Sequence, residues 1–248
     1  MSDGYAYDHA WADERVRLAG LETALDPGTR EHFLRLGLAP GSRCLDVGGG
    51  GGSVAFWLAE QVVPGGSVLV TDLETDFLES EADRHSGLEV LQHDVTIEDL
   101  PGDFDFVHAR WLVEWLPDKR LALQRMVNAL KSGGTLLVEE PDFVSIFGTA
   151  EPPALRRTMT AAMAYLESTC SVEVTYGRRL LDVSSPLGSV TLEQRGARQW
   201  SMAAALRLRT SFVSPSKSFG DRCLIREMCP SKSSPRPSRP CETPGEPS

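Results

Sequence analysis

The chain has 248 residues, 41% of them hydrophobic, which suits one α/β domain with or without an appendage. Its 25 basic and 35 acidic side chains give a formal charge of −10, which would repel a phosphate backbone, so we expect no nucleic-acid partner. No apolar run approaches a membrane span, and the polar N-terminus lacks the pattern of a secretory signal, so we expect a cytoplasmic protein with no membrane partner.

Residues 1–40 predict two helices. The first has one apolar stripe, and Asp26-Pro27-Gly28 is expected to end it before the second begins at Thr29. We interpret residues 1–40 as an N-terminal helical lid. The stripe of the first helix consists of Trp11, Val16, Leu18, Leu21 and Leu25.

From residue 43 onward, predicted strands and helices alternate. Strands are predicted at 43–47, 67–72, 88–94, 104–108, 135–140 and 190–194, and helices at 54–63, 75–84, 118–131 and 153–169. Such alternation is typical of a Rossmann-like, doubly wound α/β fold with a mostly parallel sheet. We assign this domain to residues 41–200.

Residues 201–248 differ in character. The stretch 215–248 holds seven of the sixteen prolines and a single aromatic residue, Phe219. Such a segment buries too little apolar surface to offset its ordering entropy, so we predict a disordered tail after residue 200. The mixture of Ser, Pro, Arg and Cys also suggests a shifted reading frame.

A glycine-rich stretch at residues 46–52 lies between the first predicted strand and the helix after it, as in nucleotide-binding sites. A flexible linker is the alternative, and the position between strand and helix disfavours it. The NAD-binding pattern G-x-G-x-x-G fails at Ser53, whereas Asp46-x-Gly48-x-Gly50-x-Gly52 is present. An acidic residue ahead of the glycines suits a ligand that carries an ammonium group there.

Five segments in this order resemble the core of class I S-adenosylmethionine-dependent methyltransferases: 45–50, 71–73, 93–95, 104–110 and 130–140. The resemblance covers residues 43–141. More broadly, residues 5–180 resemble actinobacterial small-molecule methyltransferases of the methyltransferase-domain type. The resemblance implies S-adenosylmethionine as the cofactor. It also implies a sheet that ends in an antiparallel C-terminal hairpin, which we expect to be incomplete in this chain and to leave an exposed edge. The five cysteines form no CxxC pair, so we expect no metal site.

The resemblance also implies roles for individual residues. Asp72 would accept hydrogen bonds from both ribose hydroxyls, and Asp94 would accept one from the adenine amino group. Their alternatives are a helix N-cap for Asp72 and a turn cap for Asp94. Asp46 and the glycines would hold the methionine moiety. The full set of cofactor-binding residues is Asp46, Gly48, Gly49, Gly50, Gly52, Asp72, Leu73, Asp94, Val95, Ala109 and Arg110.

The implied reaction is an in-line displacement that carries the methyl group of the sulfonium to a small organic acceptor, and the protein mainly positions the two. We assign no catalytic residue, and the candidates for a general base are His108, Glu114, Glu139, Glu140 and Asp142. Adjacent acids on a strand cannot both point inward.

Several aromatic residues have two interpretations. Trp115 stands where the family often has His, and it is either a contact for an aromatic substrate or a core residue. Tyr5, Tyr7, Trp11 and Trp57 would either contact the acceptor or belong to the core.

Two other functions stay open: a non-catalytic or inactive cofactor-binding relic, and an NAD-dependent oxidoreductase. No Asn- or Asp-Pro-Pro-Tyr/Phe motif follows the fourth strand, which argues against methylation of exocyclic base nitrogens. The acceptor and the oligomeric state are left open.

Overall fold

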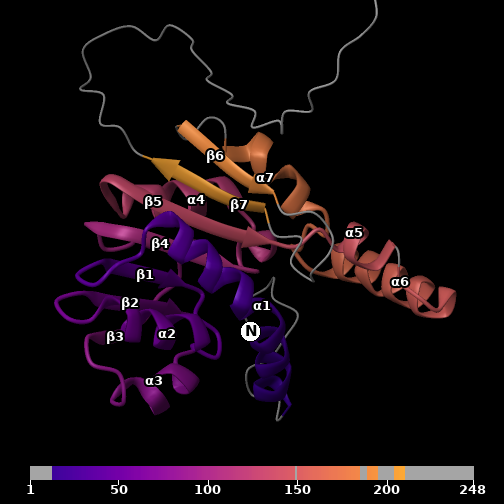
Figure 1. Ribbon diagram of the computed structural model, residues 1–248. Helices are drawn as coiled ribbons and strands as arrows, with labels where there is room; N and C mark the ends of the chain where they lie inside the picture. The colour runs from indigo at the N-terminus through magenta and orange to yellow at the C-terminus, as the bar shows by residue number, and fades with distance from the viewer. Residues whose placement is uncertain (1–12, 149, 185–188, 195–203, 210–248) are drawn as a thin grey trace, which may run out of the picture. The chain divides into compact units, whose positions relative to one another are not determined.

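The computed structural model describes residues 13–148, 150–184, 189–194 and 204–209 (Figure 1). The chain divides into two compact units, Met1–Phe212 and Val213–Ser248, and every described residue belongs to the first. Tyr5, Tyr7 and Trp11 lie outside the described residues. So do residues 210–248, where the tail prediction and the reading-frame hypothesis mainly fall.

Seven strands form one sheet in the order β3-β2-β1-β4-β5-β7-β6. The first five are parallel, and β7 runs antiparallel to both β5 and β6. The predicted Rossmann-like α/β fold is confirmed. The strands are β1 (Arg43–Val47), β2 (Ser67–Asp72), β3 (Leu88–Gln92), β4 (Phe104–Arg110), β5 (Leu130–Glu140), β6 (Ser189–Gln194) and β7 (Ala204–Arg209).

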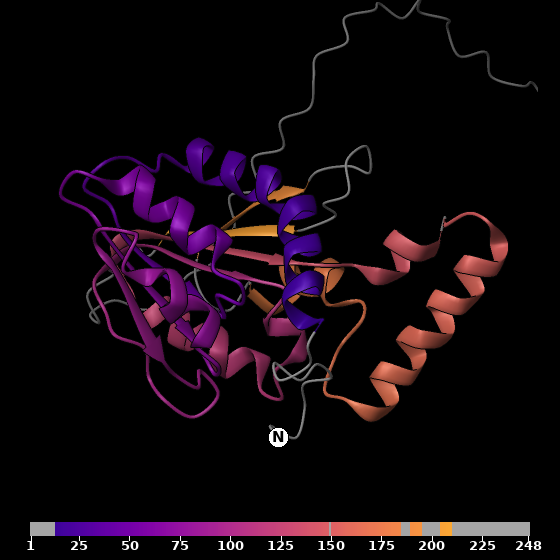
Figure 2. The ribbon, with the colours of Figure 1, turned by 90° about the horizontal axis from the view of Figure 1, so that it is seen from below.

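Helices cover both faces of the sheet (Figures 1 and 2). One buried cluster packs α1, α2 and α3 against one face, and another packs α4 and α7 against the other. In Figure 2, α5 and α6 extend beyond the end of β5. The helices are α1 (Glu14–Leu36), α2 (Ser53–Val62), α3 (Asp76–Ala82), α4 (Lys119–Asn128), α5 (Phe143–Gly148), α6 (Pro153–Thr169) and α7 (Tyr176–Ser184), with a 3-10 turn η1 (Val113–Trp115).

Side chains alternate between these faces because a strand has a period of two residues. In β4, Phe106 belongs to the cluster under α1 and α2, whereas Val107 belongs to the cluster under α4. The same alternation separates Glu139 and Glu140 at the end of β5, since Leu137 faces α1 and Leu136 faces α4. The expectation that adjacent acids point to opposite faces is therefore met.

The predicted break of the N-terminal helix at Asp26-Pro27-Gly28 is wrong. Helix α1 runs without interruption from Glu14 to Leu36 with Pro27 inside it. A proline inside a helix removes one backbone hydrogen bond and costs about 3 kcal/mol. Bonds to Asp26 from outside the helix offset this cost, because its carboxylate accepts from Ser53 and Arg110, both at 3.0 Å.

The prediction of an incomplete C-terminal hairpin is also wrong. Strand β7 lies beyond residue 200, where we expected a disordered tail, and it pairs with β5 from Thr135↔Arg209 to Glu140↔Ala204. The sixth strand is where the sequence predicts it, at Ser189–Gln194. The edge of β5 is therefore covered, and long-range pairing outweighs the weak local signal. Within the described residues, no helix has the length and apolar character to span a membrane.

Candidate cofactor site

The glycine-rich loop lies at the carboxyl end of β1, where parallel sheets bind ligands. Gly48, Gly50 and Gly52 have φ values of 73°, 57° and 90°, a region that favours glycine. The backbone N–H groups of Gly48 and Gly49 both donate to the carbonyl of Thr71, at 2.7 and 3.1 Å. This loop is therefore fixed to β2, which a flexible linker would not be.

Asp72 joins this loop to the end of β2. Its Oδ2 accepts a hydrogen bond of 2.8 Å from the N–H of Gly50, and its Oδ1 accepts one of 3.3 Å from the N–H of Glu74. The residue at the N-cap of α3 is Thr75, so the N-cap alternative does not describe Asp72. Leu73 beside it is exposed. The structure thus brings together the first and second of the predicted cofactor segments.

Asp94, after β3, caps a turn. Its Oδ1 accepts from the N–H and the hydroxyl of Thr96, at 2.8 and 2.6 Å, as the alternative interpretation predicts. Val95 is buried, and its carbonyl accepts from Arg125 at 2.8 Å. A role toward adenine stays a prediction for Asp94.

Asp46 lies deeper than its predicted role suggests, with only 3% of its surface exposed. Its Oδ1 is 2.7 Å from Nδ1 of His108, and Nε2 of His108 is 3.2 Å from Glu139. Burial alone would lower the pKa of His108, but the two carboxylates raise it to about 9. His108 is therefore an imidazolium at neutral pH, and it neutralises the acidic residue of the loop.

Glu139 extends this buried network to α1. One of its oxygens accepts from the hydroxyl of Thr29 at 2.6 Å, and the other is 2.7 Å from Nδ1 of His32. Burial raises its pKa, yet the hydrogen bonds from His108 and His32 hold that pKa below the usual range. Glu139 is thus ionised and ties the helix to the sheet.

Arg110 completes the network on the same face. Its guanidinium donates to Thr29 at 2.9 Å and to Asp26 at 3.0 Å, whereas Ala109 is fully buried on the opposite face. The sequence places Ala109 and Arg110 beside the cofactor. In the structure, the side chains of both residues contact other parts of the protein. Glu22, Asp26 and Thr29 are spaced so that they lie on one face of a helix. This face is not evident from the sequence, because the sequence predicts a helix end at Pro27, whereas α1 continues through that residue.

Comparison with known proteins shows what this arrangement is similar to. Residues 45–136 match the family model described as Methyltransferase domain. This part of the chain is therefore similar to methyltransferase domains. The same fold occurs in an S-adenosylmethionine-dependent methyltransferase from Aquifex aeolicus, with a TM-score of 0.57 and 16% identity over 79% of this chain and 98% of that one.

Two relatives are similar in sequence. Methyltransferase str3 of Strobilurus tenacellus is 31% identical over 159 residues, which cover 61% of this chain and 55% of that protein. Trans-aconitate 2-methyltransferase of Rhodopseudomonas palustris is 28% identical over 130 residues, or 52% of this chain and 46% of that protein. The chain thus spans about half the length of these relatives.

The candidate bases that the sequence predicts are hydrogen-bonded to other residues or buried. Glu140 accepts from the backbone N–H groups of Leu112, Val113 and Glu114, at 3.3, 2.8 and 3.2 Å. Glu114 is fully buried. Burial, together with Glu140, raises the pKa of Glu114 to about 10, and burial raises that of Glu140 to about 8.

The remaining candidate, Asp142, forms an ion pair of 2.6 Å with Arg178. His108 has the structural role that we considered more common for a histidine at a strand end. Within the described ranges, no group of three or more His, Cys, Asp and Glu side chains gathers as a metal site.

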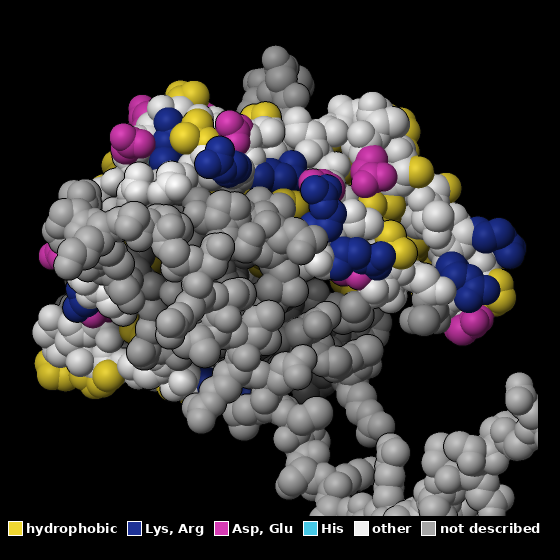
Figure 3. Space-filling view, turned by 90° about the horizontal axis from the view of Figure 1, so that it is seen from above, with side chains coloured by type: hydrophobic (Ala, Val, Ile, Leu, Met, Phe, Trp, Pro, Cys, Tyr) yellow, Lys and Arg dark blue, Asp and Glu magenta, His cyan; other side chains and the backbone are white. Residues whose placement is uncertain are grey.

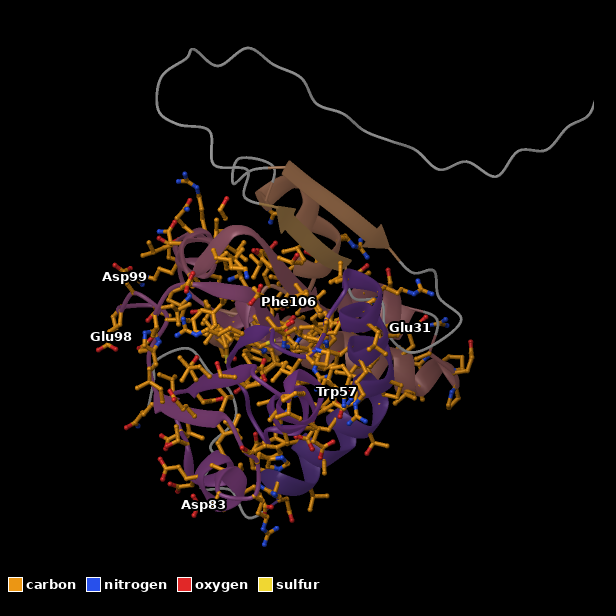
Figure 4. All side chains as sticks on the ribbon, turned by 60° about the vertical axis from the view of Figure 1, so that its left-hand side comes forward. Glu31, Trp57, Asp83, Glu98, Asp99 and Phe106 are labelled. Carbon is orange, nitrogen blue, oxygen red and sulfur yellow. The ribbon has the colours of Figure 1, made fainter. Side chains whose placement is uncertain are left out.

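The two described tryptophans with open interpretations belong to the core of the domain. Trp115 is 8% exposed in a cluster with Phe143, Val172 and Val174. Trp57 packs against Phe33 of α1 with ring centroids 6.0 Å apart, and Figure 4 shows it beside that helix. These contacts agree with the core interpretation of both residues.

Proposed function

We propose that this chain transfers a methyl group from S-adenosylmethionine to a small organic acceptor by in-line displacement. The observation that carries the proposal is the hydrogen bond between Asp72 and Gly50, which sets a carboxylate beside the glycine loop at the carboxyl end of the sheet. A carboxylate in this place can accept bonds from two neighbouring hydroxyls of a ribose.

The cofactor choice depends on more than Asp72, because dinucleotide sites also place an acid at the end of the second strand. The loop lacks the third glycine of the dinucleotide pattern, since Ser53 stands there. The fold and the family model favour S-adenosylmethionine over NAD. We infer that the cofactor contacts the loop glycines, Asp72, Leu73, Asp94 and Val95.

A small acceptor is favoured by one relative, which is named for methylation of trans-aconitate, a small acid. Figure 3 shows one face of the molecule, where dark blue basic and magenta acidic side chains lie side by side in the described part. The five acidic and histidine candidates contact protein or are buried, so we propose that positioning, with no general base among these five residues, supplies the catalysis.

The inactive relic is less favoured than the sequence suggests. That alternative depended on a missing strand, and β7 is present and paired to β5. The glycine loop and the buried contacts among Asp46, His108 and Glu139 are also present in the described residues.

Calorimetric titration with S-adenosylhomocysteine and with NAD tests the cofactor. We expect micromolar binding of the first and none of the second, and an absence of S-adenosylhomocysteine binding would overturn the proposal. Turnover of methyl-labelled cofactor with a panel of small metabolites then separates an enzyme from a relic.

A further inference from the structure

Glu22 of α1 lies against the glycine loop, although it is far from the loop in sequence. A Cβ atom added at Gly51 would lie 2.2 Å from Oε1 of Glu22, so this carboxylate occupies the space that a side chain at residue 51 would fill. It also accepts a hydrogen bond from the backbone N–H of Ser53, where α2 begins. Glu22 therefore contacts both ends of the last turn of the loop.

Gly51 has no conformational need to be glycine. Its φ is not among the positive values that mark Gly48, Gly50 and Gly52. A Cβ at residue 51 would collide with the carboxylate of Glu22, which would then have to move away from the loop. The carboxylate of Glu22 and the backbone of Gly51 are therefore in close contact.

Among the described residues, the carboxylate of Glu22 differs from its acidic neighbours in having no direct ion pair. Asp46 is paired with His108 at 2.7 Å, and Asp26 is paired with Arg110 at 3.0 Å. No salt bridge within 4.0 Å joins Glu22 to a basic side chain in the described part of the chain. Burial, and then the charge of Asp26, raise the pKa of Glu22, whereas the hydrogen bond from Ser53 and the charges of Arg110 and Arg15 lower it by less. A cation bound beside Glu22 would relieve this unfavourable charge.

We propose that Glu22 binds the ammonium group of the methionine moiety of S-adenosylmethionine. The resemblance assigns that part of the cofactor to Asp46, whose charge is already neutralised by His108. Thr29 and His32 of the same helix contact Glu139 of β5, and these contacts fix the position of α1, and with it Glu22, against the sheet. The inference rests on the proposed function.

The test compares two ligands that differ in one group. S-adenosylhomocysteine carries the ammonium group, and its desamino analogue has hydrogen there and keeps the carboxylate. Each is titrated against the full-length protein, against Glu22→Gln and against Glu31→Gln. Glu31 is a matched control because it lies on the same helix with 43% of its side chain exposed, paired with Arg35, and Figure 4 shows it away from the sheet.

We expect Glu22→Gln to bind S-adenosylhomocysteine about tenfold more weakly and the desamino analogue with unchanged affinity. Glu31→Gln should match the wild type with both ligands. The proposal fails if the affinities for both ligands fall equally, or if that for S-adenosylhomocysteine is unchanged. Wild-type protein that binds neither ligand would overturn the proposed function itself. Unchanged melting temperatures would show that both variants are folded. Glu22→Gln removes a negative charge close to that of Asp26, so we do not expect it to lower the melting temperature.

Discussion

His108 carries the positive charge between two buried carboxylates on neighbouring strands. Asp46 lies opposite it in the register of β1 and β4, and Glu139 follows on β5. Removal of one partner from such a buried arrangement costs about 3–5 kcal/mol, because the remaining charges are left uncompensated. We expect His108→Gln to lower the free energy of unfolding by about this amount at pH 7 in urea. His85→Gln removes a partly exposed ring that stacks on Phe56, and it should lower the free energy of unfolding by much less.

The pKa of His108 also makes this loss depend on pH. The folded protein binds the proton more firmly, since the pKa is raised from 6.5 to about 9. The stabilisation is complete below about pH 6.5 and is lost as the pH rises through about 9. The difference between wild type and His108→Gln should therefore narrow from pH 6.5 to pH 9.5. An equal difference at both values would contradict the assignment of the imidazolium.

Glu114 has the opposite consequence for stability. Its pKa is raised to about 10 from 4.5, so the unfolded chain releases the proton first and stability falls as the pH rises between these values. Glutamine has nearly the same shape and does not ionise. We expect Glu114→Gln to match the wild type at pH 5 and to melt higher at pH 8 by scanning calorimetry. Exposed Glu98→Gln is the control, and a gain there would indicate a general charge effect.

At the scale of elements, α1 joins the loop and the sheet into one site. Its exposed Pro27 leaves one carbonyl of the helix without its usual donor. We expect Pro27→Ala to raise the free energy of unfolding by about 1–3 kcal/mol, measured in urea. Pro40→Ala, after the helix, should give no such gain. A loss of stability in Pro27→Ala would support the break that the sequence predicts.

At the scale of the whole molecule, β7 decides whether the sheet is closed at β5. A chain ended after residue 212 keeps both β6 and β7, and we expect it to melt at the wild-type temperature and to bind S-adenosylhomocysteine equally well. A chain ended after residue 188 exposes the edge of β5 and should aggregate in size-exclusion chromatography. If the chain that ends after residue 212 unfolds, residues 213–248 contribute to the stability of the fold.

The sequence is sufficient to predict the features that depend on residues close together in the chain. Alternating apolar strands and helices predict the parallel sheet, and the ends of β1 and β2 predict where the glycines and Asp72 lie, because strand ends share one edge. Local patterns suffice there, since each element is specified by its own periodicity.

Three features depend on the tertiary structure and were not predicted from the sequence. They are the continuity of α1, the presence of β7 and the pairing of Asp46 with His108. In each case a distant partner outweighs a local preference: hydrogen bonds from β4 and α2 hold the helix through Pro27, and pairing with β5 orders a weakly patterned strand. The position of the glycine loop between β1 and α2 is therefore predicted correctly from the sequence, whereas the charges beside the loop depend on residues far away in the chain.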